Sequence, residues 1–203
     1  MPTQRFENLP KEKKEKIIHA MVDVFAQKGI DDTDIADIVK KAEIARGSFY
    51  SYFEDKDDAI FFIMDLIKKE KLVRLEGLFE EAEDIPFIDF YYKAFVISLD
   101  FAKSSPKYVS IGASIFTSRN KKVEEYIRKG MESFFPYYSK LIDKDKAKGI
   151  IHSSLDNRSI ILLLNNATSD IAINTLYKNQ LPFEEVQSIF DDVFQIIKKG
   201  LSM

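Results

Sequence analysis

Residues 25–56 read FAQKGIDDTDIADIVKKAEIARGSFYSYFEDK, and this stretch decides the fold. Apolar side chains recur at helical spacing after Asp34, whose carboxylate can cap a helix, and they predict a short helix over residues 34–41. After a break at residues 42–44, a second short helix fits residues 45–53. Two short helices joined by a tight turn form the arrangement that places a helix in the major groove of DNA. Spacing alone is a weak signal, because any two packed short helices share it.

The chain on both sides of this segment is also expected to be helical. A helix over residues 10–28 ends at Gly29, and a long one follows over residues 57–83. At 1.5 Å per residue the long helix would span roughly 40 Å, so it is expected to join two domains, 1–56 and 57–203. Further helices fit residues 86–103, 106–116, 120–148, 156–177 and 182–199. Because no Asn-Gly or Asp-Gly hairpin signal occurs, the sequence predicts an all-α chain of about nine helices.

The composition excludes several classes of protein. The 203 residues carry a formal net charge of −3 and are 45% hydrophobic, which excludes a disordered polyelectrolyte and a histone-like protein. With no Cys, disulfide scaffolds and thiolate metal sites are excluded, and His19 and His152 alone cannot build a His-rich metal site. No apolar run approaches the roughly 18–20 residues of a membrane span, and no apolar signal segment opens the chain. We therefore expect a cytoplasmic protein without a membrane partner.

Residue patterns typical of enzymes are missing from the sequence. It has no glycine-rich phosphate loop, no His-x-Glu or Cys pair and no Gly-x-Ser-x-Gly elbow. Its carboxylates stand at helix caps and at positions expected to be exposed. We expect no catalytic residue, no metal and no cofactor.

The particular residues of the helix-turn-helix segment sharpen its interpretation. Phe25-Ala-Gln-Lys-Gly29 is followed by Thr33, Ile38 and Ala42, and then by Gly47-Ser-Phe-Tyr-Ser-Tyr-Phe53 and Lys56. This pattern closely resembles the TetR family of bacterial repressors, whose segment ends in Gly-Thr-Leu-Tyr-x-Tyr-Phe-x-x-Lys. The rest of the chain agrees with the family in length and helix layout only. The resemblance implies a homodimer that binds palindromic double-stranded operator DNA and is released from it when the C-terminal domain binds a small effector.

The resemblance also implies which residues contact DNA. Arg46, in the first turn of the second short helix, can read a guanine edge with two hydrogen bonds. Gly47 lets the helix approach the DNA backbone, and Lys56 is expected to bind phosphate. For Tyr50 and Tyr52, plain packing remains the alternative. The expected DNA contacts are Thr33, Lys40, Lys41, Arg46, Gly47, Ser48, Tyr50, Tyr52 and Lys56.

Three departures from the pattern leave a second hypothesis open. Glu43 stands where the family usually has Gly, and a positive φ there would cost roughly 1 kcal/mol. Asp34 replaces a Thr that contacts phosphate in the family, and its charge would repel DNA, so it is left out of the contact set. Residues 1–56 hold ten basic and eleven acidic side chains, without the basic excess usual in a nucleic-acid domain. The alternative is a helical small-molecule-binding protein whose DNA binding is lost or weak.

The last two helices are expected to form a dimer interface. Residues 156–177 are apolar nearly all round, which requires burial on more than one side, and residues 182–199 carry a one-sided apolar stripe. A two-fold symmetric interface would cover both. Asn165 could pair across the dimer or meet an effector, and the dimer is favoured. The expected interface residues are Ile161, Asn165, Thr168, Ala172, Phe190, Phe194 and Ile197.

Aromatic side chains crowd residues 87–138. Most are expected to belong to the core, but their number also suits the apolar wall of a small-molecule pocket with a few hydroxyl groups. A hydrophobic effector is therefore expected. The candidate pocket residues are Tyr91, Phe95, Tyr108, Phe116, Tyr126, Phe134 and Tyr138.

Overall fold

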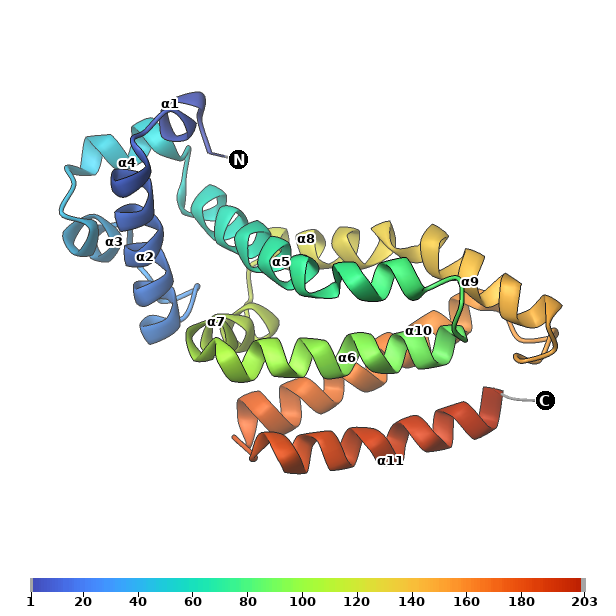
Figure 1. Ribbon diagram of the computed structural model, residues 1–203. Coiled ribbons are helices and arrows are strands. Elements are labelled where there is room, and N and C mark those ends of the chain that lie inside the picture. The colour runs from blue at the N-terminus through green and yellow to red at the C-terminus, as the bar shows by residue number, and fades with distance from the viewer. Residues whose placement is uncertain (1, 202–203) are drawn as a thin grey trace. The chain divides into compact units, whose positions relative to one another are not determined.

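The computed structural model describes residues 2–201, except for the side chains at positions 173, 177 and 178. This part of the chain contains helices and no strand (Figure 1), so the all-α prediction is confirmed. None of the helices within it combines the length and the apolar character that crossing a membrane requires.

The helices follow one another with short connections. They are α1 (Gln4–Glu7), α2 (Lys11–Lys28), α3 (Ile35–Ala42), α4 (Arg46–Tyr52), α5 (Lys56–Glu81), α6 (Phe87–Ser104), α7 (Pro106–Phe116), α8 (Lys121–Ser133), α9 (Phe135–Ala147), α10 (Asn157–Ile171), the π-helical segment η1 (Ala172–Lys178) and α11 (Phe183–Leu201).

Two compact units share the chain. We call Met1–Glu70 with Ser105–Ile127 the head unit, and Lys71–Ser104 with Arg128–Met203 the bundle unit. The long helix α5 contributes residues to both units. The division differs from a single boundary after residue 56, because α7 and the first part of α8 fold with the N-terminal helices.

The core of the head unit explains this division. Ile111 of α7 and Val123 of α8 are buried in one hydrophobic cluster with Met21 and Phe25 of α2. Burying apolar side chains is the main favourable term in folding, so it decides which helices associate. α2 packs against both α3 and α7.

A short N-terminal helix that the sequence analysis did not predict completes this core. Phe6 of α1 is fully buried, and its ring centroid lies 4.9 Å from that of Phe53 and 5.2 Å from that of Phe62. The Thr3 amide donates to the Tyr52 carbonyl at 2.9 Å, which ties this end of the chain to the end of α4.

The bundle unit is built from the remaining parts of α5 and α8 with α6, α9, α10, η1 and α11. Figure 1 shows α10 and α11 side by side, and α11 also packs against α6. The single helix predicted over residues 120–148 is wrong, because it breaks at Phe134 between α8 and α9. Pro136 explains the break, since proline lacks an amide hydrogen and is tolerated only in the first turn of a helix.

Two neighbouring residues of α9 hold the connection between α5 and α6. The fully buried Asp145 accepts a hydrogen bond from the Phe87 amide at 2.5 Å, at the start of α6. Lys144 donates at 2.7–3.2 Å to three carbonyl groups of the connection, those of Ala82, Glu83 and Ile85. These bonds satisfy backbone groups that helix ends leave without partners.

Candidate nucleic-acid interface

The two short helices are held against the head unit by their apolar sides. Ile38 and Ala42 of α3 and Phe49 of α4 are fully buried. Asp34 and Asp37 form the capping box expected at the start of α3, in which the Asp34 amide donates to the Asp37 carboxylate at 3.2 Å. The opposite sides of α3 and α4 therefore face outward.

The outward side of α4 presents several of the expected DNA contacts. Arg46, Gly47 and Tyr50 are exposed, and Ser48 is half-buried. The Arg46 guanidinium lies over the Tyr50 ring, 6.0 Å from its centroid, a cation–π arrangement that holds the two side chains together. A Cβ atom on Gly47 would meet nothing within 4 Å. The packing of this chain therefore does not demand glycine at position 47.

Thr33 and Tyr52 do not lie on this accessible surface. Thr33 is 1% exposed and its hydroxyl donates to the Gly29 carbonyl at 2.7 Å. Tyr52 is 4% exposed, and its ring packs against Phe6 with centroids 5.9 Å apart. In this conformation both side chains are part of the core. For Tyr52 this corresponds to plain packing, the alternative to a DNA contact that the sequence left open.

Lys56 is also engaged within the chain. Its ammonium donates to the Asp31 carbonyl at 2.9 Å and to the Thr33 carbonyl at 3.0 Å. Both acceptors belong to the loop between α2 and α3. Sequence reasoning missed this role because the partners lie more than twenty residues apart and no local pattern connects them.

The lysines of α3 differ in their surroundings. Lys40 is exposed. Lys41 lies 3.4 Å from the Asp23 carboxylate, which also binds Lys107 at 2.6 Å. The hydrogen bond from Lys107, assisted by Lys41, holds the pKa of Asp23 below its ordinary value. Part of the acidic charge of the head unit is therefore paired rather than presented to a partner.

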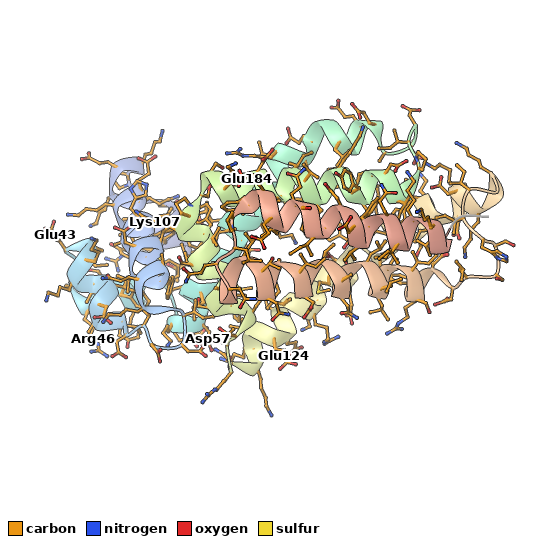
Figure 2. All side chains as sticks on the ribbon, turned by 90° about the horizontal axis from the view of Figure 1, so that it is seen from below. Glu43, Arg46, Asp57, Lys107, Glu124 and Glu184 are labelled. Atoms are coloured by element: carbon orange, nitrogen blue, oxygen red, sulfur yellow. The ribbon has the colours of Figure 1, made fainter. Side chains whose placement is uncertain are left out.

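Glu43 occupies the turn between α3 and α4 in the left-handed conformation, with φ 54° and ψ 46°. Its carboxylate pairs with the Lys16 ammonium, and this hydrogen bond holds the pKa of Glu43 below its ordinary value. Figure 2 shows Glu43 and Arg46 at the outer edge of the head unit. The turn thus places the Glu43 carboxylate beside α4, the candidate reading helix, and Lys16 compensates part of the charge of this carboxylate.

The candidate pocket residues are divided between the two units. Tyr108, Phe116 and Tyr126 belong to the head unit, whereas Tyr91, Phe95, Phe134 and Tyr138 belong to the bundle unit. In the head unit, two hydroxyls donate to carboxylates of α5: that of Tyr108 to Glu70 and that of Tyr126 to Asp65.

An aromatic cluster lies in the bundle unit, with Tyr138 at its centre. The Tyr138 ring centroid lies 5.6–6.0 Å from those of Phe87, Tyr91 and Phe134. Burial raises the pKa of Tyr91 to about 12, and its hydroxyl donates to the Asn165 side-chain oxygen at 2.8 Å. The cluster thus combines two phenylalanine and two tyrosine rings.

A shallow groove of about 300 Å³ opens on the same unit. It is lined by Leu78, Glu81, Tyr92, Lys93, Val96 and Ile97. Lys93 and Glu81 form an ion pair at 3.3 Å, and the Tyr92 hydroxyl donates to Asp191 at 2.8 Å. None of these residues stood in the expected pocket set, because nothing in their spacing separates a groove wall from ordinary core.

The expected interface residues divide into three groups. Ile161, Phe190 and Phe194 are 2–4% exposed and fill the core of their own chain. Asn165 and Thr168 approach the Tyr91 hydroxyl at 2.8 and 3.2 Å. Ala172 and Ile197 are half-buried.

Other apolar residues of α10 and α11 face outward. Leu162 is 47% exposed, Leu163 49% and Ile196 71%. Leu162 and Leu163 were not among the expected interface residues, because in a helix that is apolar all round the spacing does not reveal which side faces its own chain.

Comparison with known proteins connects the head unit with transcriptional regulators. Residues 17–60 match the family model described as bacterial regulatory proteins, tetR family. An uncharacterized HTH-type transcriptional regulator of Bacillus subtilis (strain 168), YvdT, is 26% identical over 93% of this chain and 95% of its own length.

Solved structures share the fold over nearly the whole chain. A TetR family transcriptional regulator from Chloroflexus aurantiacus J-10-FL is 23% identical, with a TM-score of 0.70 and coverage of 100% of this chain and 99% of its own. The transcriptional regulator FadR of Bacillus subtilis, solved in complex with stearoyl-CoA, is 16% identical, with a TM-score of 0.74 and coverage of 92% and 98%. At sequence identities of 16–23%, these comparisons show that the chain shares the fold of these proteins and no more.

The turn at Glu43 gives a prediction on stability. Glycine adopts a positive φ without the steric cost that other residues incur, so Glu43→Gly is expected to stabilise the protein by about 0.5–1 kcal/mol, even though it removes an exposed ion pair. Glu43→Gln, which removes the charge and keeps the strain, is the matched control and is expected not to stabilise. Urea denaturation of both variants provides the measurement. A Glu43→Gly variant no more stable than Glu43→Gln would contradict the assignment of strain to this turn.

Proposed function

This chain belongs to the TetR family of bacterial transcriptional regulators, and we propose that it is a dimeric repressor that binds palindromic operator DNA and is released by a hydrophobic effector. The observation that carries the DNA-binding part is the outward side of α4. There an exposed arginine, a glycine with open space around it and an exposed tyrosine follow one another within the first turns of the helix. The accessible contact set is Lys40, Lys41, Arg46, Gly47, Ser48 and Tyr50.

Arg46 is the proposed reader of sequence. Its guanidinium is planar and can donate two parallel hydrogen bonds to the paired acceptors of guanine. Tyr50, which lies under the guanidinium, limits the orientations that Arg46 can take and so reduces the entropy lost on binding. Lys40 and Lys41 are expected to contact phosphate, which adds affinity without sequence information.

Arg46→Ala is expected to weaken binding to the duplex that lies upstream of the protein's own gene by about 1–3 kcal/mol, and binding to a scrambled duplex much less. Lys69→Ala, which removes one exposed positive charge from α5, is the control and is expected to leave the ratio of the two affinities unchanged. Both duplexes are titrated in a mobility-shift assay at one salt concentration. An equal loss on both duplexes would reduce Arg46 to a phosphate contact, and no binding by the unchanged protein would favour the alternative of a small-molecule-binding protein that has lost DNA binding.

The proposed dimer interface lies on the exposed sides of α10 and α11. The His152 amide donates to the Leu201 carbonyl at 3.0 Å, so the start of α10 lies beside the end of α11. This places Leu162, Leu163 and Ile196 at the same end of the helix pair. Apolar side chains that gather on a surface mark an interaction site, and a second copy of the chain would cover them by two-fold symmetry.

The double variant Leu163→Glu/Ile196→Glu is expected to sediment as a monomer at micromolar concentration and to bind its operator more weakly, because each monomer then engages a single half-site. Its side chains are exposed in the single chain, so the fold is expected to persist. Val73→Glu introduces a charge at another exposed apolar position, 56% exposed on α5, and is expected to remain dimeric. A double variant that stays dimeric would place the interface elsewhere.

The effector proposal rests on the apolar character of the bundle unit. Its groove of about 300 Å³ lies at the small end of the range for ligand sites, and Leu78, Val96 and Ile97 give it an apolar lining beside the Lys93–Glu81 ion pair. The aromatic cluster around Tyr138 offers further apolar surface. An elongated apolar molecule with a polar end group suits these features, and stearoyl-CoA, which is bound in the related fold of FadR, is a suitable probe.

Stearoyl-CoA is expected to lower the affinity for the operator by roughly 5–150-fold, the usual size of an allosteric coupling, and operator must lower the affinity for the acyl-CoA by the same factor. Free coenzyme A is the control and is expected to have no effect, because it lacks the apolar chain. The two titrations are done by fluorescence anisotropy with labelled duplex and by calorimetry with ligand. Binding of stearoyl-CoA without any change in operator affinity would contradict release by this class of effector.

A further inference from the structure

Polar contacts from α7, from the connector between α7 and α8 and from α5 hold the loop between α2 and α3. Gly29 ends α2 with φ 78°. A Cβ atom added to Gly29 would lie only 3.3 Å from Ser114 Cβ of α7, so the two segments lie very close together. The Ile30 amide donates to the Ser114 hydroxyl at 3.2 Å. α7 therefore fixes the first half of the loop.

The connector between α7 and α8 fixes the centre of the loop through Asp31. The Asp31 carboxylate accepts hydrogen bonds from the Ser118 hydroxyl at 2.6 Å and from the Arg119 amide at 3.0 Å. Burial opposes the charge, but these two hydrogen bonds and the nearby Lys56 hold the pKa of Asp31 below its ordinary value. The side chain is thus an ionised acceptor, and charge-assisted hydrogen bonds of this kind are stronger than neutral ones.

The Lys56 side chain holds the same loop by bonding to carbonyl groups of the loop backbone. Two of its three N–H donors are used by the Asp31 and Thr33 carbonyls, as described above. The next residue, Asp57, accepts from the Asn120 side-chain amide at 2.7 Å and pairs with Lys122 at 2.8 Å. The connector is therefore bonded both to the loop and to the start of α5, and it closes a ring of contacts around Lys56.

These contacts bear directly on α3 and α4. Helices of seven or eight residues are not stable by themselves, so their positions depend on what holds their ends. The loop 29–34 leads directly into α3, and α3 leads through the Glu43 turn into α4. A displacement of the loop would move Arg46 relative to a bound duplex, and binding geometry tolerates displacements of only a fraction of an ångström.

We propose that Asp31, Lys56 and the α7–α8 connector form a clamp that positions the reading helix, and that Lys56 acts on DNA affinity through the loop rather than as a phosphate ligand. The proposal rests on the DNA-binding function proposed above. Asp31 and Lys56 are then positioning residues. The connector, which carries Ser118 and Arg119, becomes a place where a change in the protein alters operator affinity without touching DNA.

For Asp31→Ala, the direction of the change in operator affinity tests the clamp. Removing a negative charge from a DNA-binding unit should by electrostatics alone strengthen binding, whereas opening the clamp should weaken it. The clamp predicts about tenfold weaker operator binding for Asp31→Ala, and a smaller loss for the milder Ser118→Ala. Asp32→Ala, at the exposed neighbouring carboxylate, is the matched control and is expected to bind as well as the unchanged protein or slightly better. Asp31→Ala binding as tightly as Asp32→Ala would overturn the proposal.

Lys56→Met separates positioning from phosphate binding through salt dependence. A lost phosphate contact makes the slope of log K against log salt shallower by about 0.9 for each half-site, whereas a lost clamp lowers affinity at an unchanged slope. Adding Asp31→Ala to Lys56→Met should weaken binding by less than the product of the two single effects, because both act on one loop. A shallower slope for Lys56→Met, or fully multiplicative losses, would contradict the clamp.

Hydrogen exchange of the α3 and α4 amides provides a readout that needs no DNA. Asp31→Ala is expected to speed exchange in these helices relative to Asp32→Ala while circular dichroism shows the same helix content. If the unchanged protein bound no specific duplex, the proposed function would fail and the exchange rates would still decide on the clamp. Unchanged exchange in α3 and α4 would overturn it.

Discussion

A helix of seven or eight residues has too few hydrogen bonds to persist in water, and this constraint applies to both helices that carry the candidate reading surface. Their buried sides, at Ile38, Ala42 and Phe49, anchor them to α2 and α5 through apolar packing. Packing of this kind is non-directional, so it fixes distance better than orientation. The hydrogen bonds of Asp31 and Lys56 fix the orientation of the loop that leads into α3. The outward side of α4 can then be left polar and open, which is what a surface that meets DNA requires.

The bundle unit follows a different principle. Its core combines aliphatic with aromatic side chains. Two of its buried polar groups are bonded within the unit: the Tyr91 hydroxyl donates to Asn165, and Asp145 accepts from the Phe87 amide. Apolar side chains that the unit cannot cover by itself lie on α10 and α11. Both units have an apolar core, but the head unit fixes the loop before α3 by directed polar contacts, whereas the bundle unit leaves apolar side chains on its surface.

Local signals made the helix-turn-helix segment of the fold predictable. Gly29 ends α2 and Asp34 starts α3 as expected, and the left-handed turn considered at Glu43 is present. Partners distant in sequence were not predictable. Nothing near Lys56 indicates that it bonds the loop carbonyls, and nothing in α7 indicates that Ile111 joins the head core rather than the bundle core. The all-round apolar character of α10 indicated burial but could not distinguish Leu162, which faces outward, from Ile161, which faces its own core. The break at Phe134 did have a signal in Pro136, which the long-helix prediction disregarded.

A footprint of the unchanged protein on the duplex upstream of its own gene tests the central claim most directly. A dimer that presents two copies of α4 should protect two half-sites related by two-fold symmetry, with centres one helical turn or a multiple of it apart, about 34–36 Å for one turn. Protection should vanish at the same protein concentration on a scrambled duplex. Protection of a single half-site would contradict the dimer. The absence of any sequence-dependent protection would contradict DNA recognition by this chain.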